Sequence, residues 1–120
     1  MRVLIHPRNM TADENLRSRL DRCLETTLQP VQRYLEGVNV YLTDVNGPRG
    51  GPDKRCRVVA HLPGGRPVVV SRTDSDPLAA VSQAAGQLRR SVRAAVKRRR
   101  FNGRNGRQAR QLAEYSSRSA

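Results

Sequence analysis

Apolar and polar residues alternate with a period of two in several segments of the chain, and this pattern is typical of half-buried β-strands. The first expected strand is instead a short run of mostly apolar residues, which we expect to end at Pro7. Two glycines after Pro63 can supply the positive φ angles of a tight turn, which would join the last two strands as a hairpin. The expected strands cover residues 2–6, 38–45, 54–62 and 66–72.

The segment after the first strand has apolar residues at every third or fourth position, which predicts an amphipathic helix. Thr11 and Glu14 have the spacing of a capping box with Thr11 as the N-cap, and Gly37 is expected to end the helix as its C-terminal cap. Pro30 lies inside the pattern, where an interior proline costs about 3 kcal/mol. We therefore expect a break near residues 26–29, followed by one final turn.

A second amphipathic segment begins at Asp76-Pro77, where the acid suits the N-cap and the proline suits the first helical position. Asn102-Gly103 is expected to end this helix. The order of elements predicts an α+β fold, β-α-β-β-β-α, with a four-stranded mixed sheet and two helices packed on one face. The first two strands are expected to be parallel because a helix connects them. We expect one α+β domain over residues 1–100 and a disordered basic tail over residues 101–120.

Positive charge is concentrated in the last quarter of the chain. The protein has 23 Lys or Arg against 10 Asp or Glu, a formal net charge of +13. Residues 1–88 hold 12 basic and 9 acidic side chains, whereas residues 89–120 hold 11 basic side chains and 1 acidic one. Such an asymmetry indicates a negatively charged partner, either nucleic acid or an anionic membrane surface.

The basic residues of the second helix are expected to form an ordered surface. At about 100° per residue, five of them fall beside and behind the apolar stripe of the same helix. Several are spaced three or four apart, so that like charges face each other, and each such pair costs a few tenths of a kcal/mol without a partner. A merely solvated helix surface is the alternative, but it usually mixes both signs of charge. This basic ridge consists of Arg89, Arg90, Arg93, Lys97 and Arg100.

The residue types favour structured RNA over a membrane or single-stranded nucleic acid. A membrane-surface helix needs bulky apolar residues opposite its charges, and this one has mostly Ala and Val, which the sheet requires. Seven of the eight basic residues from 89 to 104 are Arg, which binds phosphate with two parallel hydrogen bonds. With three Tyr, one Phe and no Trp, the chain has few rings on which bases could stack.

No residue pattern indicates catalysis, a cofactor or a metal site, and we expect no enzyme. His6 and His61 lack a neighbouring acid or thiol in a catalytic arrangement. Asp74 and Asp76 are better explained by a loop and a helix cap than by magnesium binding. Cys23 and Cys56 have no metal-ligand spacing, and we expect both to be reduced thiols in a cytoplasmic protein.

Several short motifs, in this order and spacing, resemble the family of ribosome hibernation-promoting factors and ribosome-associated inhibitors in its short form. Some members of this family were named sigma-factor modulation proteins. The resemblance covers about residues 1–100, and none of its motifs is catalytic. The motifs are Arg8-Asn9-Met10, Leu16-Arg17, Arg33-Tyr34-Leu35-Glu36 before Val38-Asn39-Val40, and Asp76-Pro77-Leu78-Ala79-Ala80-Val81 before the basic run.

The resemblance implies a cytoplasmic protein that binds the small ribosomal subunit through 16S rRNA, in the channel of mRNA and tRNA, and blocks translation under stress or in stationary phase. We expect no membrane or small-molecule partner and a monomer when the protein is free. Another structured-RNA module, of the ribosomal-protein or double-stranded-RNA type, stays open, as does a protein-interaction module that uses the exposed sheet face. Whether the protein promotes or opposes ribosome dimerisation is also open. The expected RNA-binding residues are Arg89, Arg90, Arg93, Lys97, Arg98 and Arg100, with Arg19 and Arg22 from the first helix.

Overall fold

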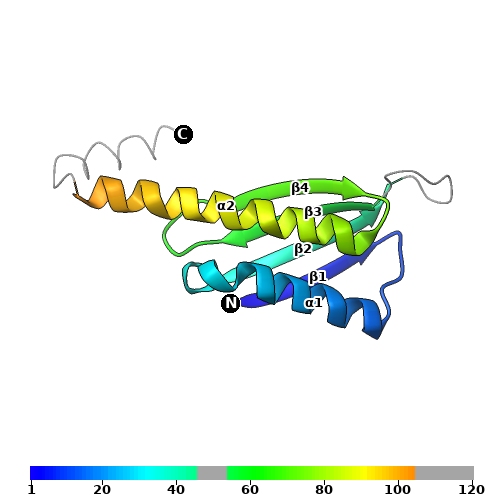
Figure 1. Ribbon diagram of the computed structural model, residues 1–120. Coiled ribbons are helices and arrows are strands. Elements are labelled where there is room, and N and C mark those ends of the chain that lie inside the picture. The colour runs from blue at the N-terminus through cyan, green and yellow to red at the C-terminus, as the bar shows by residue number, and fades with distance from the viewer. Residues whose placement is uncertain (46–53, 105–120) are drawn as a thin grey trace.

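The computed structural model describes residues 1–45 and 54–104, and the side chains of α2 through Arg98 (Figure 1). Its element order is β-α-β-β-β-α with one 3-10 helix, η1, after the first α-helix, which confirms the expected fold class. The elements are β1 (Arg2–Arg8), α1 (Glu14–Leu28), η1 (Gln29–Tyr34), β2 (Gly37–Asp44), β3 (Lys54–His61), β4 (Val68–Asp74) and α2 (Pro77–Arg104).

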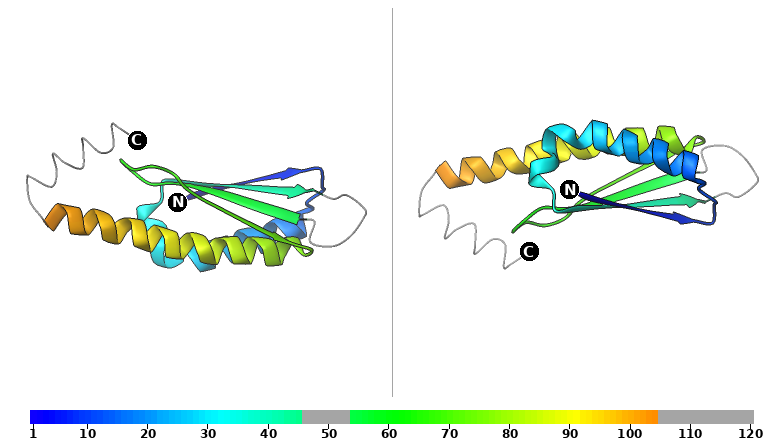
Figure 2. Two further views of the ribbon diagram at one scale, coloured as in Figure 1. Left: turned by 90° about the horizontal axis from the view of Figure 1, so that it is seen from above. Right: turned by 90° about the horizontal axis from the view of Figure 1, so that it is seen from below.

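The four strands form one mixed sheet in the order β1-β2-β3-β4. β1 and β2 are parallel, as expected, and the other neighbours are antiparallel. Both helices cover the same face of the sheet, and no helix of the described residues covers the other face, which we call the open face (Figure 2). Side chains alternate between the faces, so that Val38, Val40 and Leu42 of β2 are buried under the helices.

The hydrophobic core lies between the sheet and the two helices, as the apolar spacing predicts. Leu20, Leu24 and Leu28 of α1 are fully buried. On α2, Leu88 and Val92 are also fully buried, together with smaller Ala and Val residues nearer its start. Each such Leu or Val side chain contributes roughly 1.5–3 kcal/mol through its removal from water. The core therefore fixes the face that α2 turns toward the sheet.

The expected cap residues of the first helix were wrong. Asp13, not Thr11, is the N-cap, because its carboxylate accepts a hydrogen bond of 2.8 Å from the backbone N–H of Leu16. Glu14 is therefore the first residue of α1, too close to the cap for a capping box. Gly37 does not cap the helix but begins β2, where it pairs with Arg2. Leu35, which ends η1, already has an extended backbone, so the chain leaves η1 without a left-handed residue at its end.

Two prolines lie where the local geometry tolerates a missing N–H. The expected break before Pro30 is confirmed, since α1 ends at Leu28 and Pro30 lies in the first turn of η1, where its N–H would have no helical partner. Pro7 does not end the first strand, which continues to Arg8. β1 is an edge strand, and proline is tolerated at sheet edges.

The start of α2 is confirmed, and its extent is greater than expected. The carboxylate of Asp76 accepts a hydrogen bond of 3.1 Å from the N–H of Leu78, and Pro77 is the first helical residue. The helix continues through Asn102 and Gly103 to Arg104, because the long Arg-rich run before them has high helix propensity. Its C-terminal part extends beyond the sheet (Figure 1). Disorder was expected for residues 101–120. Most of them, residues 105–120, lie outside the described residues.

Candidate nucleic-acid interface

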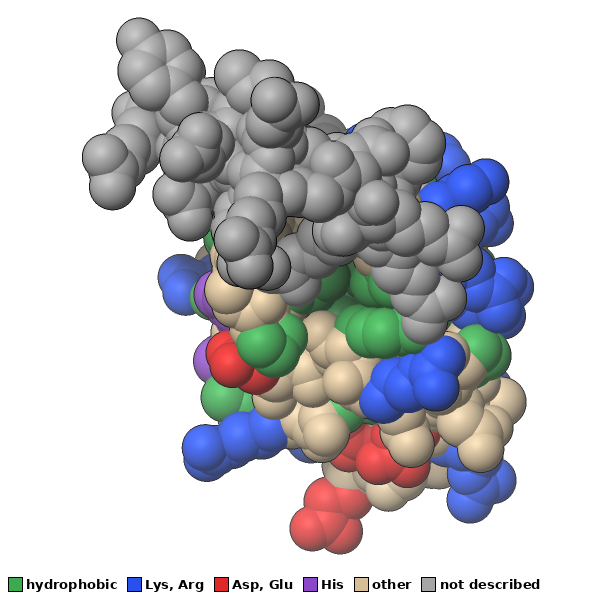
Figure 3. Space-filling model, turned by 90° about the vertical axis from the view of Figure 1, so that its left-hand side faces the viewer, with side chains coloured by type: hydrophobic (Ala, Val, Ile, Leu, Met, Phe, Trp, Pro, Cys, Tyr) green, Lys and Arg blue, Asp and Glu red, His purple; other side chains and the backbone are tan. Residues whose placement is uncertain are grey.

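The basic ridge lies on the solvent side of α2, held by the buried stripe beneath it. Leu88 and Val92 are fully buried, while Arg90, Arg93 and Lys97 are exposed. Arg89 is half-buried, and its Nε atom is buried without a hydrogen-bond partner. Figure 3 shows Lys and Arg side chains gathered along the right-hand edge of the molecule, the side on which the helices lie. The side chain of Arg100 is not among those described.

The described side chains of the ridge are not paired with the acids of the described residues. α2 contains no Asp or Glu over its 28 residues. Within residues 1–45 and 54–104, an ion pair is formed by Lys54 and Asp44, at 3.0 Å on the sheet, and none by the basic side chains described on α2. Because none of the described acids pairs with these side chains, their positive field extends into solvent and toward any anion there.

One end of the ridge combines with η1 to form a basic hollow. The hollow has a volume of about 300 Å³ and is bordered by Arg33 and Tyr34 of η1 and by Arg93 and Lys97 of α2. The Nη2 atom of Arg33 donates a hydrogen bond of 2.8 Å to the Tyr34 hydroxyl, and its guanidinium carbon lies 4.8 Å from the centroid of that ring. Three cations from two elements thus surround one concave site, and the ring holds Arg33 in place.

Arg19 and Arg22 lie in a second hollow, between α1 and the start of α2. This hollow has a volume of about 460 Å³, and Leu78 and Ser82 form its α2 side. Ser82 precedes Arg93 by 11 residues, about 16 Å along the helix axis. Arg19 and Arg22 therefore form a group of their own on the helical side, separate from the ridge.

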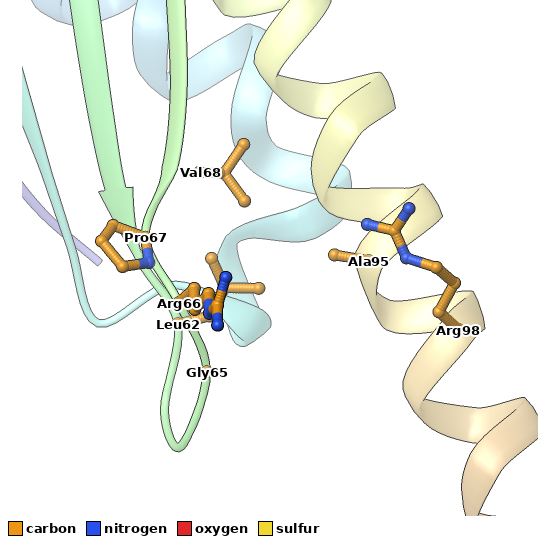
Figure 4. A pocket seen from close by; sticks show the side chains of 7 residues that line it. All are labelled: Leu62, Gly65, Arg66, Pro67, Val68, Ala95 and Arg98. Carbon is orange, nitrogen blue, oxygen red and sulfur yellow. The ribbon is translucent and has the colours of Figure 1, made fainter. Parts of the chain in front are cut away.

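Arg98 is separated from the ridge. It lies on the opposite flank of α2, where it borders a hollow of about 360 Å³ between the helix and the β3–β4 hairpin. Figure 4 shows Arg98 and Ala95 on the helix facing Arg66 and Val68 across this space. The expected RNA-binding residues thus form three groups on the helical side of the molecule, not one continuous row.

Sequence reasoning missed Arg33 and Arg66. Each lies in a short connecting segment, Arg33 in η1 and Arg66 in the turn between β3 and β4, where helical periodicity gives no signal. For Arg33, the adjacent Tyr34 was a usable sign, because arginine often stacks on an aromatic neighbour. Their proximity to α2 depends on tertiary packing.

The described part of the chain has no arrangement suited to a metal ion. Across residues 1–45 and 54–104, no three His, Cys, Asp or Glu side chains are grouped to bind one. His6 contacts Asn39 at 3.1 Å and stacks on Tyr41. Burial and, to a lesser degree, the nearby Cys23 raise the pKa of Cys56 to about 12, which keeps this core thiol protonated. No helix in this part of the chain is long and apolar enough to span a membrane.

Two solved structures are similar to this fold. A ribosomal subunit interface protein from Coxiella burnetii has a TM-score of 0.68 and 13% identity, over 81% of this chain and 99% of that chain. The N-terminal domain of Thermus thermophilus Protein Y has a TM-score of 0.58 and 23% identity, over 77% of this chain and 96% of that one. No curated protein sequence matches the chain. Residues 3–100, however, match one family profile, and this match confirms the resemblance found in the sequence: the chain belongs to the Sigma 54 modulation protein / S30EA ribosomal protein family.

Proposed function

We propose that this protein is a ribosome hibernation factor that binds 16S rRNA of the small subunit in the channel of mRNA and tRNA. Its family is one of ribosome-associated modulation proteins, not an enzyme class. By filling the channel, the protein would exclude both RNAs and block translation under stress or in stationary phase. It would act in the cytoplasm without a cofactor.

The observation that carries this proposal is the basic ridge, whose described side chains form no ion pair within residues 1–45 and 54–104. Because the core holds α2 on one side, the guanidinium groups are presented without an ordering cost for the backbone. Arg90 and Arg93 are exposed and free to contact phosphate in pairs of hydrogen bonds. Phosphate contacts of this kind fix position and shape rather than base identity.

The hollow formed with η1 is the best candidate for the strongest phosphate contact. Arg33, Arg93 and Lys97 border it, so a phosphate there would meet three cations at once. Arg19 and Arg22 would contact a neighbouring part of the same RNA. Arg98, with Arg66, would contact RNA from the other flank of α2.

The test is binding of the variant R93E/K97E to purified small subunits. We expect binding to be lost while the melting temperature stays within a few degrees of wild type, since both side chains are exposed. R17E/R72E is the matched control, because it reverses two exposed arginines away from the ridge and should retain binding. If R93E/K97E binds as the control does, the ridge is not the contact surface.

Sedimentation of cell lysate through a sucrose gradient tests the partner itself. The wild-type protein is expected to migrate with small subunits or with particles that contain them, and R93E/K97E is expected near the top. Migration of the wild type with free RNA alone would instead support a general structured-RNA module. Affinity should also fall steeply between about 50 and 300 mM salt, because each phosphate contact releases counterions, and a flat response would contradict phosphate binding.

A further inference from the structure

The open face of the sheet carries a second cluster of arginines that the helical surface does not include. Across the strands, Arg8 is next to Thr43, which pairs with Arg55 of β3. Arg57 lies two residues further along β3 and pairs with Tyr41. Along a strand, residues two apart are separated by about 6.7 Å, and next-nearest strands by about 10 Å. We call Arg8, Arg55 and Arg57 the sheet patch.

Among residues 1–45 and 54–104, the acids nearest to the sheet patch lie apart from it. All three arginines are exposed, and within the described residues they form no ion pair. Asp44, at the end of β2, points to the other face and is paired with Lys54. Glu36 lies at the opposite end of the sheet, where its N–H bonds to the carbonyl of His61. The charge of the patch is therefore directed away from the protein.

An aromatic pair holds one of these arginines in place. The rings of His6 and Tyr41 stack with centroids 4.9 Å apart and an angle of 18° between their planes. The guanidinium carbon of Arg8 lies 5.8 Å from the Tyr41 centroid. The Nε2 atom of His6 is 3.1 Å from Oδ1 of Asn39, which links the stack to the sheet. A guanidinium stacked on a ring keeps its N–H edges free for phosphate.

Protection against aggregation does not explain the sheet patch. Charged residues often prevent exposed edge strands from pairing with other chains, and this applies to Arg8 on β1. Arg55 and Arg57, however, lie on β3, an internal strand with neighbours on both sides. An open sheet face needs only polar side chains, or charges of both signs, to remain soluble. Like charges held close together without an acid indicate a negatively charged partner.

We propose that the sheet patch binds the phosphates of a second RNA segment, so that the protein joins two segments of folded ribosomal RNA through its opposite faces. The histidines of the open face are visible at the left edge of Figure 3, opposite the side along which the helical cations gather. A single straight RNA helix cannot contact both the helical side and the open sheet face, because these face in opposite directions. The proposal rests on the proposed binding of ribosomal RNA, and it adds a second contact surface.

This inference is tested by measuring the affinity of four proteins for purified small subunits over a range of salt concentrations. They are wild type, R55Q/R57Q for the sheet patch, R93Q/K97Q for the ridge, and R17Q/R72Q as a control with the same charge change. For R55Q/R57Q we expect affinity to fall about tenfold or more, because two charged hydrogen bonds are lost. The slope of log affinity against log salt should become shallower by about 1.4–1.8, the value for two phosphates.

The variant R55K/R57K shows whether lost charge or altered folding causes the loss of affinity in R55Q/R57Q. It keeps both charges, so it should keep the wild-type slope of log affinity against log salt. Hydroxyl-radical footprinting of the 16S rRNA should show that R55Q/R57Q and R93Q/K97Q lose protection at different nucleotides. If R55Q/R57Q matches the control, or loses affinity without losing protection of any 16S rRNA nucleotide, as expected for docking on an acidic protein, the inference is overturned. If both variants lose the same footprint, the two-segment geometry is overturned. If R93Q/K97Q binds as the control does and R55Q/R57Q loses affinity, the sheet patch stands and the proposed ridge contact fails.

Discussion

A substitution in the buried stripe of α2 should lower the stability of the fold without changing the affinity of the folded protein for RNA. Leu88→Ala tests this. Leu88 is fully buried in the core, on the same helix as the ridge. Truncation of a buried Leu removes its transfer free energy and leaves a cavity, at a cost of about 2–5 kcal/mol. For a folded part of this size, each kcal/mol shifts the melting temperature by about 4–8 °C. The variant should therefore melt at least about 8 °C below wild type.

The assay is thermal unfolding followed by circular dichroism, combined with small-subunit binding at low temperature. At about 10 °C, where most of the variant is still folded, the Arg side chains of the ridge are unchanged and affinity should lie within about threefold of wild type. Ala94→Ser is the control on the exposed side of the same helix and should change stability by less than about 0.5 kcal/mol. A shift below about 3 °C for Leu88→Ala would refute the idea that this stripe supports the ridge.

The remaining predictions concern pH and the helix cap. Burial raises the pKa of Cys56 from 9.0 to about 12, so its contribution to stability is complete below pH 9 and is lost as pH rises toward 12. Denaturant unfolding at pH 7, 9 and 10 should show this loss as a fall in unfolding free energy of up to about 1.4 kcal/mol per pH unit above pH 9. Cys56→Ala should lack this part of the pH dependence. The same pH dependence for wild type and Cys56→Ala would contradict the prediction. Asp76→Ala should cost about 1 kcal/mol, because the N–H of Leu78 loses its acceptor, whereas Asp76→Asn should retain most of the stability. Equal melting temperatures for wild type and Asp76→Ala would contradict the assigned cap.

Local periodicity was enough to predict the elements and their order. A period of two identifies strands, and a period of three to four identifies helices, because each reflects which side chains one face can bury. The stripe through Leu88 and Val92 therefore also predicted which basic residues of α2 remain in solvent. Asp76-Pro77 located the start of this helix correctly, since both residue types have one favoured position there.

The ends of elements depended on contacts that the sequence does not display. Thr11 and Asp13 are both good caps, and the backbone conformation selects Asp13. Pro7 remains in a strand because that strand lies at the sheet edge. Gly37 begins β2 because Arg2, 35 positions earlier, is its partner.

The sequence by itself determined that this protein has a basic helix with one buried side, because residue spacing fixes which side chains that side can bury. Only the tertiary structure decided which distant cations share a site with that helix. Arg33 joins Arg93 and Lys97 because η1 packs beside α2, and Arg98 is turned toward Arg66 on the other flank. Arg8 and Arg55 lie on the same face of the sheet because each is in register with Thr43 of β2, which lies between their strands. Charge along a helix follows from residue spacing, but charge gathered from separate elements follows from packing, which brings residues of large sequence separation together.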